Sequence, residues 1–131
     1  MMLPDDLRTV LDSRAICFLT TLMPDGSPQV TQTWVGTDGE HIVINTVATH
    51  QKTRNIQADA RVAVGLAHPD QPLRSWAVRG QVISVEPDAT GEHINALSNK
   101  YLGRDYPGFG GGAQQRVVLT ITVDHLHRPS R

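Results

Sequence analysis

The sequence predicts a mainly β fold: a six-stranded antiparallel barrel, closed or nearly closed, with two or three short flanking helices. Three observations favour this fold. Six short apolar segments are separated by turn signals, most connections are too short for the helical crossovers that parallel strands need, and a barrel leaves no sheet edge exposed. The 131 residues fit a single domain spanning residues 1–131.

The first half of the chain predicts one helix and three strands. Leu3, Leu7, Val10 and Leu11 recur at helical spacing, after Pro4 and two acidic residues, and this pattern predicts a short amphipathic helix. The strands that follow are predicted over residues 16–22, 29–35 and 41–46. Turn residues separate them: Pro24, Asp25 and Gly26 in the first connection, and Asp38 and Gly39 in the second.

The second half predicts two helices and three further strands. A basic helix is expected over residues 50–59, and a second helix carries Ile94, Leu97, Tyr101 and Leu102 after Thr90. The strands are predicted over residues 61–67, 75–86 and 116–123. A loop with four glycines over residues 105–115 precedes the last strand, which alternates with Val117, Leu119, Ile121 and Val123 on one face.

Composition and charge exclude several function classes. The formal net charge of −1 argues against nucleic-acid binding, which needs a concentrated basic face. Cys17 is the sole cysteine and lies in an apolar run, so we expect a buried side chain rather than a nucleophile. No segment is long and apolar enough to cross a membrane or to act as a signal peptide, which predicts a cytoplasmic protein.

The segment from His41 to Asn55 predicts an anion site. An apolar strand there ends at Thr46, and a helix that carries Lys52 and Arg54 begins within a few residues. Free amides and the dipole at a helix N-terminus favour a phosphate group, and adjacent cations add to that attraction. A phosphate site at a strand end in a small β-rich chain points toward a flavin-type cofactor.

Several motifs together resemble a known family. Thr46 and Lys52 form a T-x-x-x-x-x-K pattern, and three further segments match: L-T-T-L-M-P-D-G-S-P-Q-V, S-W-A-V-R-G-Q-V and R-V-V-L-T-I-T-V-D-H-L. Over residues 7–126 the chain resembles the flavin-binding split-barrel superfamily that includes pyridoxamine-phosphate oxidases. It is most similar to the branch that uses the deazaflavin coenzyme F-420. The resemblance implies a split β-barrel homodimer with the cofactor at the interface.

The resemblance also implies which residues bind the cofactor. It places the phosphate at Thr46 and Lys52 and the ring beside the second strand. The residues expected at the cofactor are Gln32, Thr33, Trp34, Asn45, Thr46, Gln51, Lys52, Arg54 and Trp76. Strand alternation would place Thr33 on the opposite face from Gln32 and Trp34. Asn55 is expected either to contact the ligand or to fix its helix to the barrel, and Trp34 and Trp76 either to line the pocket or to pack in the core.

The reaction implied by the resemblance is hydride transfer from F-420 to an unsaturated or conjugated small organic acceptor. The chain has no tryptophan after Trp76, whereas the vitamin-B6 oxidases carry a C-terminal tryptophan and arginine. FMN-dependent oxidation and non-catalytic binding of a flavin or tetrapyrrole are the alternatives. The six histidines form no metal signature, and neither G-x-S-x-G nor G-x-x-x-x-G-K-[ST] occurs. Cofactor-borne hydride chemistry needs no protein nucleophile.

Overall fold

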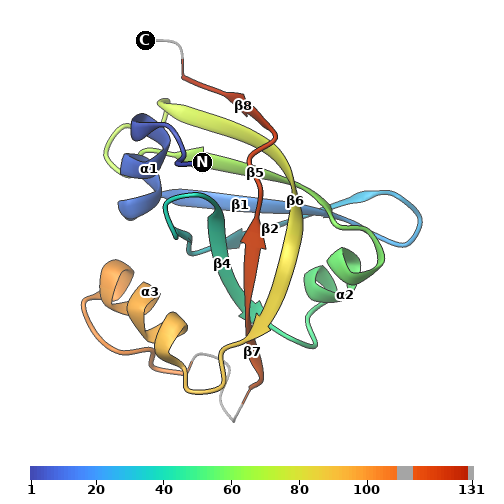
Figure 1. The fold of residues 1–131 in the computed structure, drawn as a ribbon. Coiled ribbons are helices and arrows are strands. Elements are labelled where there is room, and N and C mark those ends of the chain that lie inside the picture. Colours follow the sequence, from blue (N-terminus) through green and yellow to red (C-terminus); the bar gives the residue numbers. More distant parts are fainter. Residues whose placement is uncertain (109–113, 130–131) are drawn as a thin grey trace.

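A computed structural model describes residues 1–108 and 114–129, which contain three helices and eight strands. The helices are α1 (Asp5–Asp12), α2 (Gln51–Ala58) and α3 (Glu92–Leu102). The strands are β1 (Ile16–Leu22), β2 (Pro28–Thr33), β3 (Gly36–Thr37), β4 (Ile42–Val47), β5 (Arg61–Ala67), β6 (Ser75–Pro87), β7 (Arg116–Ile121) and β8 (His125–His127). Figure 1 shows α1 and α3 on one side of the curled sheet and α2 on the other.

The predicted fold class is confirmed: the structure is mainly β, with every strand pair antiparallel and three short helices around the sheet. All six predicted strands form. Two further strands, β3 and β8, are only two and three residues long, which is too short for an alternating pattern to reveal them. The glycine run of the predicted loop over residues 105–115 lies outside the described residues.

The sheet is an open, split barrel rather than a closed one. Its strands follow the order β2-β1-β5-β6-β7-β4-β3, with β8 added to one edge of β6. Between the two ends of this order, the described residues show no strand pairing that joins β2 to β3 or β4. A gap lined by β2 and β4 therefore remains, and the candidate site described below lies in it.

Strand β6 belongs to both halves of the barrel. Its first part pairs with β5, and its second part pairs with β7 after a register shift between Val82 and Ser84. At the crossing point the chain passes close to Gly80: a Cβ atom there would lie 1.8 Å from the backbone oxygen of Thr122. Only glycine fits this approach, which lets one long strand serve two sheets.

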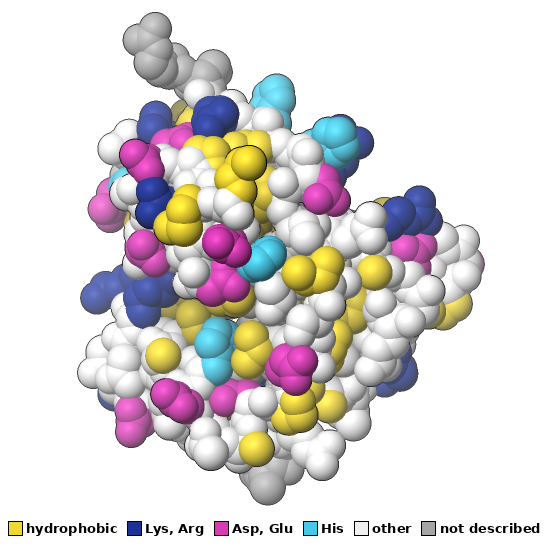
Figure 2. Space-filling view, in the orientation of Figure 1, with side chains coloured by type: hydrophobic (Ala, Val, Ile, Leu, Met, Phe, Trp, Pro, Cys, Tyr) yellow, Lys and Arg dark blue, Asp and Glu magenta, His cyan; other side chains and the backbone are white. Residues whose placement is uncertain are grey.

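Alternating apolar residues fill the barrel interior. Val117, Leu119 and Ile121 of β7 are buried, as the alternation predicted, and Leu7, Val10 and Leu11 of α1 close one end. Cys17 is fully buried in this core, and burial raises the pKa of its thiol to about 11, which confirms that it is a small core residue. On the face seen in Figure 2, acidic and basic side chains are interspersed.

Candidate functional site

A cavity of about 600 Å³ occupies the gap in the barrel. It is bordered by the end of β2, the start of β1, the end of β4, the start of α2, and α3. Its lining residues are Arg14, Ala15, Ile16, Gln32, Thr33, Trp34, Asn45, Thr46, His50, Lys52, Ile94, Tyr101, Tyr106 and Arg116. Four of these described residues are basic and none is acidic, so the cavity favours an anion even though the chain is nearly neutral.

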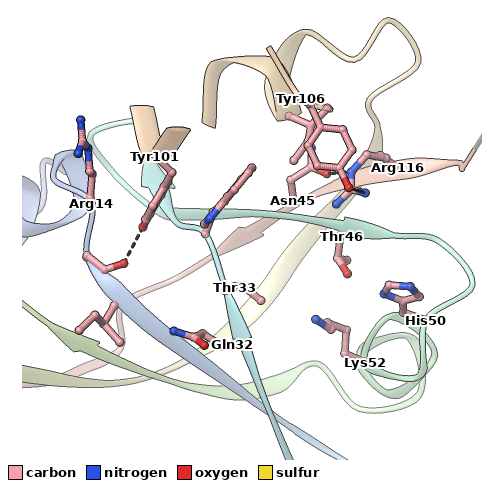
Figure 3. A pocket seen from close by; sticks show the side chains of 14 residues that line it. Arg14, Gln32, Thr33, Asn45, Thr46, His50, Lys52, Tyr101, Tyr106 and Arg116 are labelled. Carbon is pink, nitrogen blue, oxygen red and sulfur yellow. Dashed lines mark hydrogen bonds between the residues drawn. The ribbon is translucent and has the colours of Figure 1, made fainter. Parts of the chain in front are cut away.

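Three of the four basic residues, His50, Lys52 and Arg116, gather at one end of the cavity, around Thr46, whereas Arg14 lies at the other end beside Tyr101 (Figure 3). Figure 3 shows the Thr46 side chain directed toward the space between Lys52 and His50, with Arg116 nearby. Burial and the charge of Arg116 lower the pKa of Lys52. Burial and the charges of Lys52 and Arg116 lower the pKa of His50. Burial is the larger cause of both shifts and repulsion between the neighbouring cations is the smaller one, and a bound phosphate would relieve that repulsion.

Helix α2 brings its N-terminus to the same end of the cavity. No side chain caps it and its first turn contains no acidic residue. The helix is fixed from below, because the Thr53 hydroxyl donates to the backbone oxygen of Val47 over 2.8 Å. The positive end of the helix dipole thus faces the cavity together with Lys52, and both effects favour a negatively charged group.

Arg116 is held in the cavity wall by two neighbours. Its Nε donates to the side-chain oxygen of Asn45 over 2.7 Å, and one terminal nitrogen donates to the Tyr106 hydroxyl over 3.3 Å. The guanidinium also lies over the Tyr106 ring, 4.9 Å from its centroid. The Arg116 charge is therefore presented in a fixed position, although the residue lies at the start of β7, far along the sequence from Thr46.

An aromatic group forms the other part of the cavity wall. The ring of Trp34 stacks on Tyr101 with centroids 5.4 Å apart, and Tyr106 meets it edge-on at 6.2 Å. Tyr101 is fixed by its hydroxyl, which donates to the backbone oxygen of Ala15 over 2.7 Å (Figure 3). Burial raises the pKa of Tyr101 to about 12, so this wall stays neutral. A flat apolar surface beside a cationic end suits a planar ring that carries a phosphate.

Six of the nine residues predicted at the cofactor border the cavity: Gln32, Thr33, Trp34, Asn45, Thr46 and Lys52. Alternation does separate Gln32, which is exposed, from Thr33, which is half-buried and contacts Cys17. Both nevertheless border the cavity, together with Trp34, which follows the end of β2. Which of the six touch a cofactor stays a prediction.

Gln51 and Arg54 lie on α2 but do not line this cavity. The Gln51 amide donates to Asn55 over 2.7 Å, and Arg54 donates to the backbone oxygen of Thr49 and to the Gln51 side chain. Asn55 is 2% exposed and donates to the Thr21 hydroxyl over 3.0 Å, so it fixes α2 to β1. The helical repeat turns these side chains away from the face that Lys52 presents.

Trp76 does not border the cavity either, so of its two expected positions the structure shows the one in the core. It is 3% exposed and belongs to the hydrophobic core. Its indole nitrogen donates to Asp6 of α1 over 3.1 Å, and Arg74 lies over its ring. In the first part of β6 the odd-numbered side chains point outward and the even-numbered ones, including Trp76, point inward. Trp76 therefore packs beneath the N-terminal helix.

Sequence reasoning missed several polar and aromatic lining residues, among them Arg14, His50, Tyr101 and Tyr106. His50 has a local signal, because it stands immediately before the helix that carries Lys52. The two tyrosines reach Trp34 and Arg116 only through tertiary packing, and no local pattern reports that contact.

Comparison with protein families shows which family the chain belongs to. The family described as pyridoxamine 5'-phosphate oxidase matches residues 3–128, nearly the whole chain. The chain belongs to the pyridoxamine 5'-phosphate oxidase family. Its members share the split barrel implied by the sequence, so the predicted superfamily is confirmed.

Solved structures extend this family assignment. An F-420 reductase is 30% identical with a TM-score of 0.81, and the match covers 95% of this chain and 98% of that one. Rv2991 of Mycobacterium tuberculosis is 22% identical (TM-score 0.69; 96% and 83% covered), and general stress protein 26 of Bacillus anthracis is 21% identical (0.65; 91% and 87%). These two show the shared fold alone. No curated protein matches the chain.

Within residues 1–108 and 114–129, no group of three or more His, Cys, Asp or Glu side chains is placed to hold a metal ion. None of the helices described is long and apolar enough to cross a membrane. The family match and the likeness to an F-420 reductase make the chain an oxidoreductase-like member of its family, and the cavity in the barrel gap is its candidate site.

Proposed function

We propose that this protein is a coenzyme F-420-dependent reductase that passes hydride to an unsaturated or conjugated small organic acceptor. The observation that carries the proposal is a cavity whose basic end lacks any carboxylate and adjoins a flat aromatic wall. The 30% identity to an F-420 reductase over nearly all of both chains adds support.

The residues at the basic end fit the phosphate group of such a cofactor. Lys52 and Arg116 supply positive charges, Thr46 supplies a hydroxyl, and the start of α2 supplies backbone amides. The bound cofactor would supply the hydride chemistry itself. Trp34 and Tyr101 would orient the flat ring and keep water from one of its faces.

We also propose that the protein is a homodimer with a cofactor site at each end of the interface. The outer face of β1 and β2 exposes apolar side chains: Phe18 is 43% exposed and Val30 is 58% exposed. Neighbouring outward positions on β5 are small, at Ala63 and Gly65, so a flat partner surface can approach. Light scattering at micromolar concentration should give twice the chain mass, and a monomer would contradict the proposal.

The decisive experiment compares F-420 and FMN binding to the purified protein by fluorescence. F-420 carries an acidic lactyl-oligoglutamate tail, so its affinity should exceed that of FMN at low salt and fall more steeply as salt screens the exposed tail charges. Each such pair contributes only about 0.2–1 kcal/mol, so several must act together. Equal affinities with equal salt slopes would favour FMN as the cofactor.

Turnover separates an enzyme from a carrier. Reduced F-420 is mixed with the protein and a panel of conjugated acceptors, and reoxidation of the cofactor is followed optically. Acceptor-dependent reoxidation supports the reductase. Tight binding of F-420 or FMN without reoxidation by any acceptor would instead identify a non-catalytic flavin binder.

A further inference from the structure

Four side chains at the back of the cavity form a connected hydrogen-bond network. Asn45 of β4 is at its centre and is 7% exposed. Its amide oxygen accepts from Arg116 over 2.7 Å, and its amide nitrogen contacts Asp88 at 3.0 Å and the Nδ1 of His93 at 2.9 Å. Arg116 and Asn45 border the cavity, whereas Asp88 and His93 lie behind them.

The identities of these groups fix the orientation of the Asn45 amide. Arginine Nε can only donate, so Asn45 must present its oxygen to Arg116 and its two N–H groups to the other side. The Asp88 carboxylate accepts one of these protons. His93 must then accept the other at Nδ1, which requires a neutral imidazole whose proton is on Nε2.

Asp88 connects this hydrogen-bond network to the start of α3. Its two carboxylate oxygens accept from the backbone N–H groups of His93 over 3.1 Å and Ile94 over 2.9 Å. These bonds and the helix dipole hold Asp88 in place. The Asn45 amide is therefore engaged on both sides by groups that are themselves fixed, and it has little freedom to turn toward a ligand.

We propose that Asn45 is a positioning residue, which holds Arg116 in the cavity wall and does so only while His93 is neutral and accepts at Nδ1. This inference rests on the proposed function for the role of Arg116 as a phosphate ligand. It replaces the expectation that Asn45 itself binds the cofactor. When His93 is protonated, two donors face each other at 2.9 Å, so the Asn45 amide must turn and release the Arg116 Nε.

The surroundings of His93 determine when this occurs. Burial lowers the pKa of His93, and the adjacent Asp88 opposes that shift. His93 also lines a small cavity beneath α3 whose other charged residues are Asp12 of α1, Asp38 of the β3–β4 turn and Lys100 of α3. Arg116 approaches from β7 through Asn45. We therefore expect the neutral form at pH 7 and its loss under mild acid.

The first test reads the hydrogen bonds directly and needs no ligand. Imidazole ¹⁵N spectra of the wild-type protein at pH 7 should show His93 protonated at Nε2, and the Arg116 Nε–H should exchange slowly with water. As the pH falls, Arg116 exchange should accelerate with the same midpoint as the His93 titration. An Nδ1-protonated ring, or Arg116 exchange that ignores the His93 midpoint, would overturn the proposal, whatever the cofactor proves to be.

The second test asks whether Asn45 acts through Arg116. FMN is the probe, because it carries a phosphate and its fluorescence reports binding. Arg116→Ala should weaken FMN binding about tenfold and Asn45→Ala three- to tenfold. The double variant should bind like Arg116→Ala alone. Additive losses would show that Asn45 acts independently and would contradict the proposal.

Controls separate positioning from folding and from the proposed function. His127→Gln changes an exposed histidine on β8 and should leave FMN binding and Arg116 exchange unchanged. If Asn45→Ala fails to fold, the wild-type pH titration still decides the proposal. If FMN does not bind to the wild-type protein, the phosphate-site proposal fails, while the spectra still confirm or refute the Asn45–Arg116 connection.

Discussion

Helices α2 and α3 begin in opposite ways, and the difference separates a helix terminus that the chain itself caps from one at which we propose that a phosphate binds. At α3 the chain supplies its own anion, because the Asp88 carboxylate accepts from two backbone N–H groups and Glu92 lies in the first turn. At α2 the described residues provide no side-chain cap and no acidic residue in the first turn. Instead Lys52 adds a positive charge to the same end.

The two termini carry the same backbone physics, so their surroundings determine their use. A helix N-terminus needs hydrogen-bond acceptors and favours negative charge. Asp88 meets that need from within, and α3 is consequently part of the scaffold. The terminus of α2 opens on a cavity lined by no acidic residue, so the acceptor must come from water or from a ligand.

Removal of Lys52 should have the largest effect on the binding side of this comparison. Lys52→Ala should weaken binding of the phosphate-bearing cofactor by about 1.5–3 kcal/mol, since a charge-assisted hydrogen bond is lost. The free energy of unfolding should hardly change, because loss of a repelled cation offsets lost packing. Fluorescence titration measures the first quantity and urea denaturation the second.

A charge-matched control tests the assignment of Lys52. Arg128→Ala also removes one positive charge, but from an exposed pair with Asp6 far from α2. It should leave cofactor affinity unchanged. Equal affinity losses in both variants would mean that overall charge, rather than the site at α2, attracts the cofactor.

Removal of Asp88 should have the largest effect on the scaffold side. Asp88→Ala leaves two N–H groups of α3 without their acceptor, and loss of such a cap costs about 0.5–2 kcal/mol of stability. Asp88→Asn keeps one acceptor oxygen and should cost less. Urea denaturation monitored by circular dichroism checks both. A change in cofactor affinity without a change in stability would show that α3 is not held in this way.

The sequence predicted that Thr46 and Lys52 lie together at the α2 terminus, because these residues are close together along the chain, but it did not predict that Gln51 and Arg54 point away from the cavity. Thr46 and Lys52 stand six positions apart across a strand end and a helix start, and each type of element has its own local signature. The strand pattern likewise predicted the fold class. The spacing of apolar residues and the turn residues between strands are both visible within a few neighbouring positions of the sequence.

The other half depends on contacts between distant residues. Arg116 reaches Asn45 across 71 positions, and Tyr101 reaches Ala15 across 86. Alternation also left open which face of β6 points inward, and Trp76 belongs to the core face. A pattern in one strand defines two faces but does not say which one borders a cavity.

Giving α2 its own carboxylate should remove the difference between the two termini. His50 is the N-cap residue of α2, and aspartate is a preferred N-cap. His50→Asp should stabilise the fold by about 0.5–1 kcal/mol and weaken phosphate binding up to tenfold, because the new charge takes the place of the ligand. Thermal unfolding and fluorescence titration give the two values.

His50→Asn is the matched control for this variant. Asparagine caps a helix about as well as aspartate but carries no charge. It should give a similar gain in stability with a smaller loss of affinity. Should both variants bind the cofactor as tightly as the wild-type protein, the α2 terminus would not be part of the phosphate site.

The smallest expected effect is a pH dependence of stability that distinguishes the α3 side. Burial lowers the pKa of His93 from its usual 6.5, so the unfolded chain binds more protons than the folded one between the lowered value and 6.5. The contribution of His93 to the free energy of unfolding should therefore be complete above about pH 7. It should decrease as the pH falls through 6.5 toward the lowered pKa. The lowered pKa of Asp88 acts in a separate pH range, below its usual 3.8.

Urea midpoints measured between the lowered pKa of His93 and pH 7 should decrease with falling pH in the wild-type protein. They should decrease less in His93→Gln, which cannot be protonated. An equal decrease in both proteins would assign the effect to another group, with His50 of the α2 terminus the first to examine, because its pKa is also lowered.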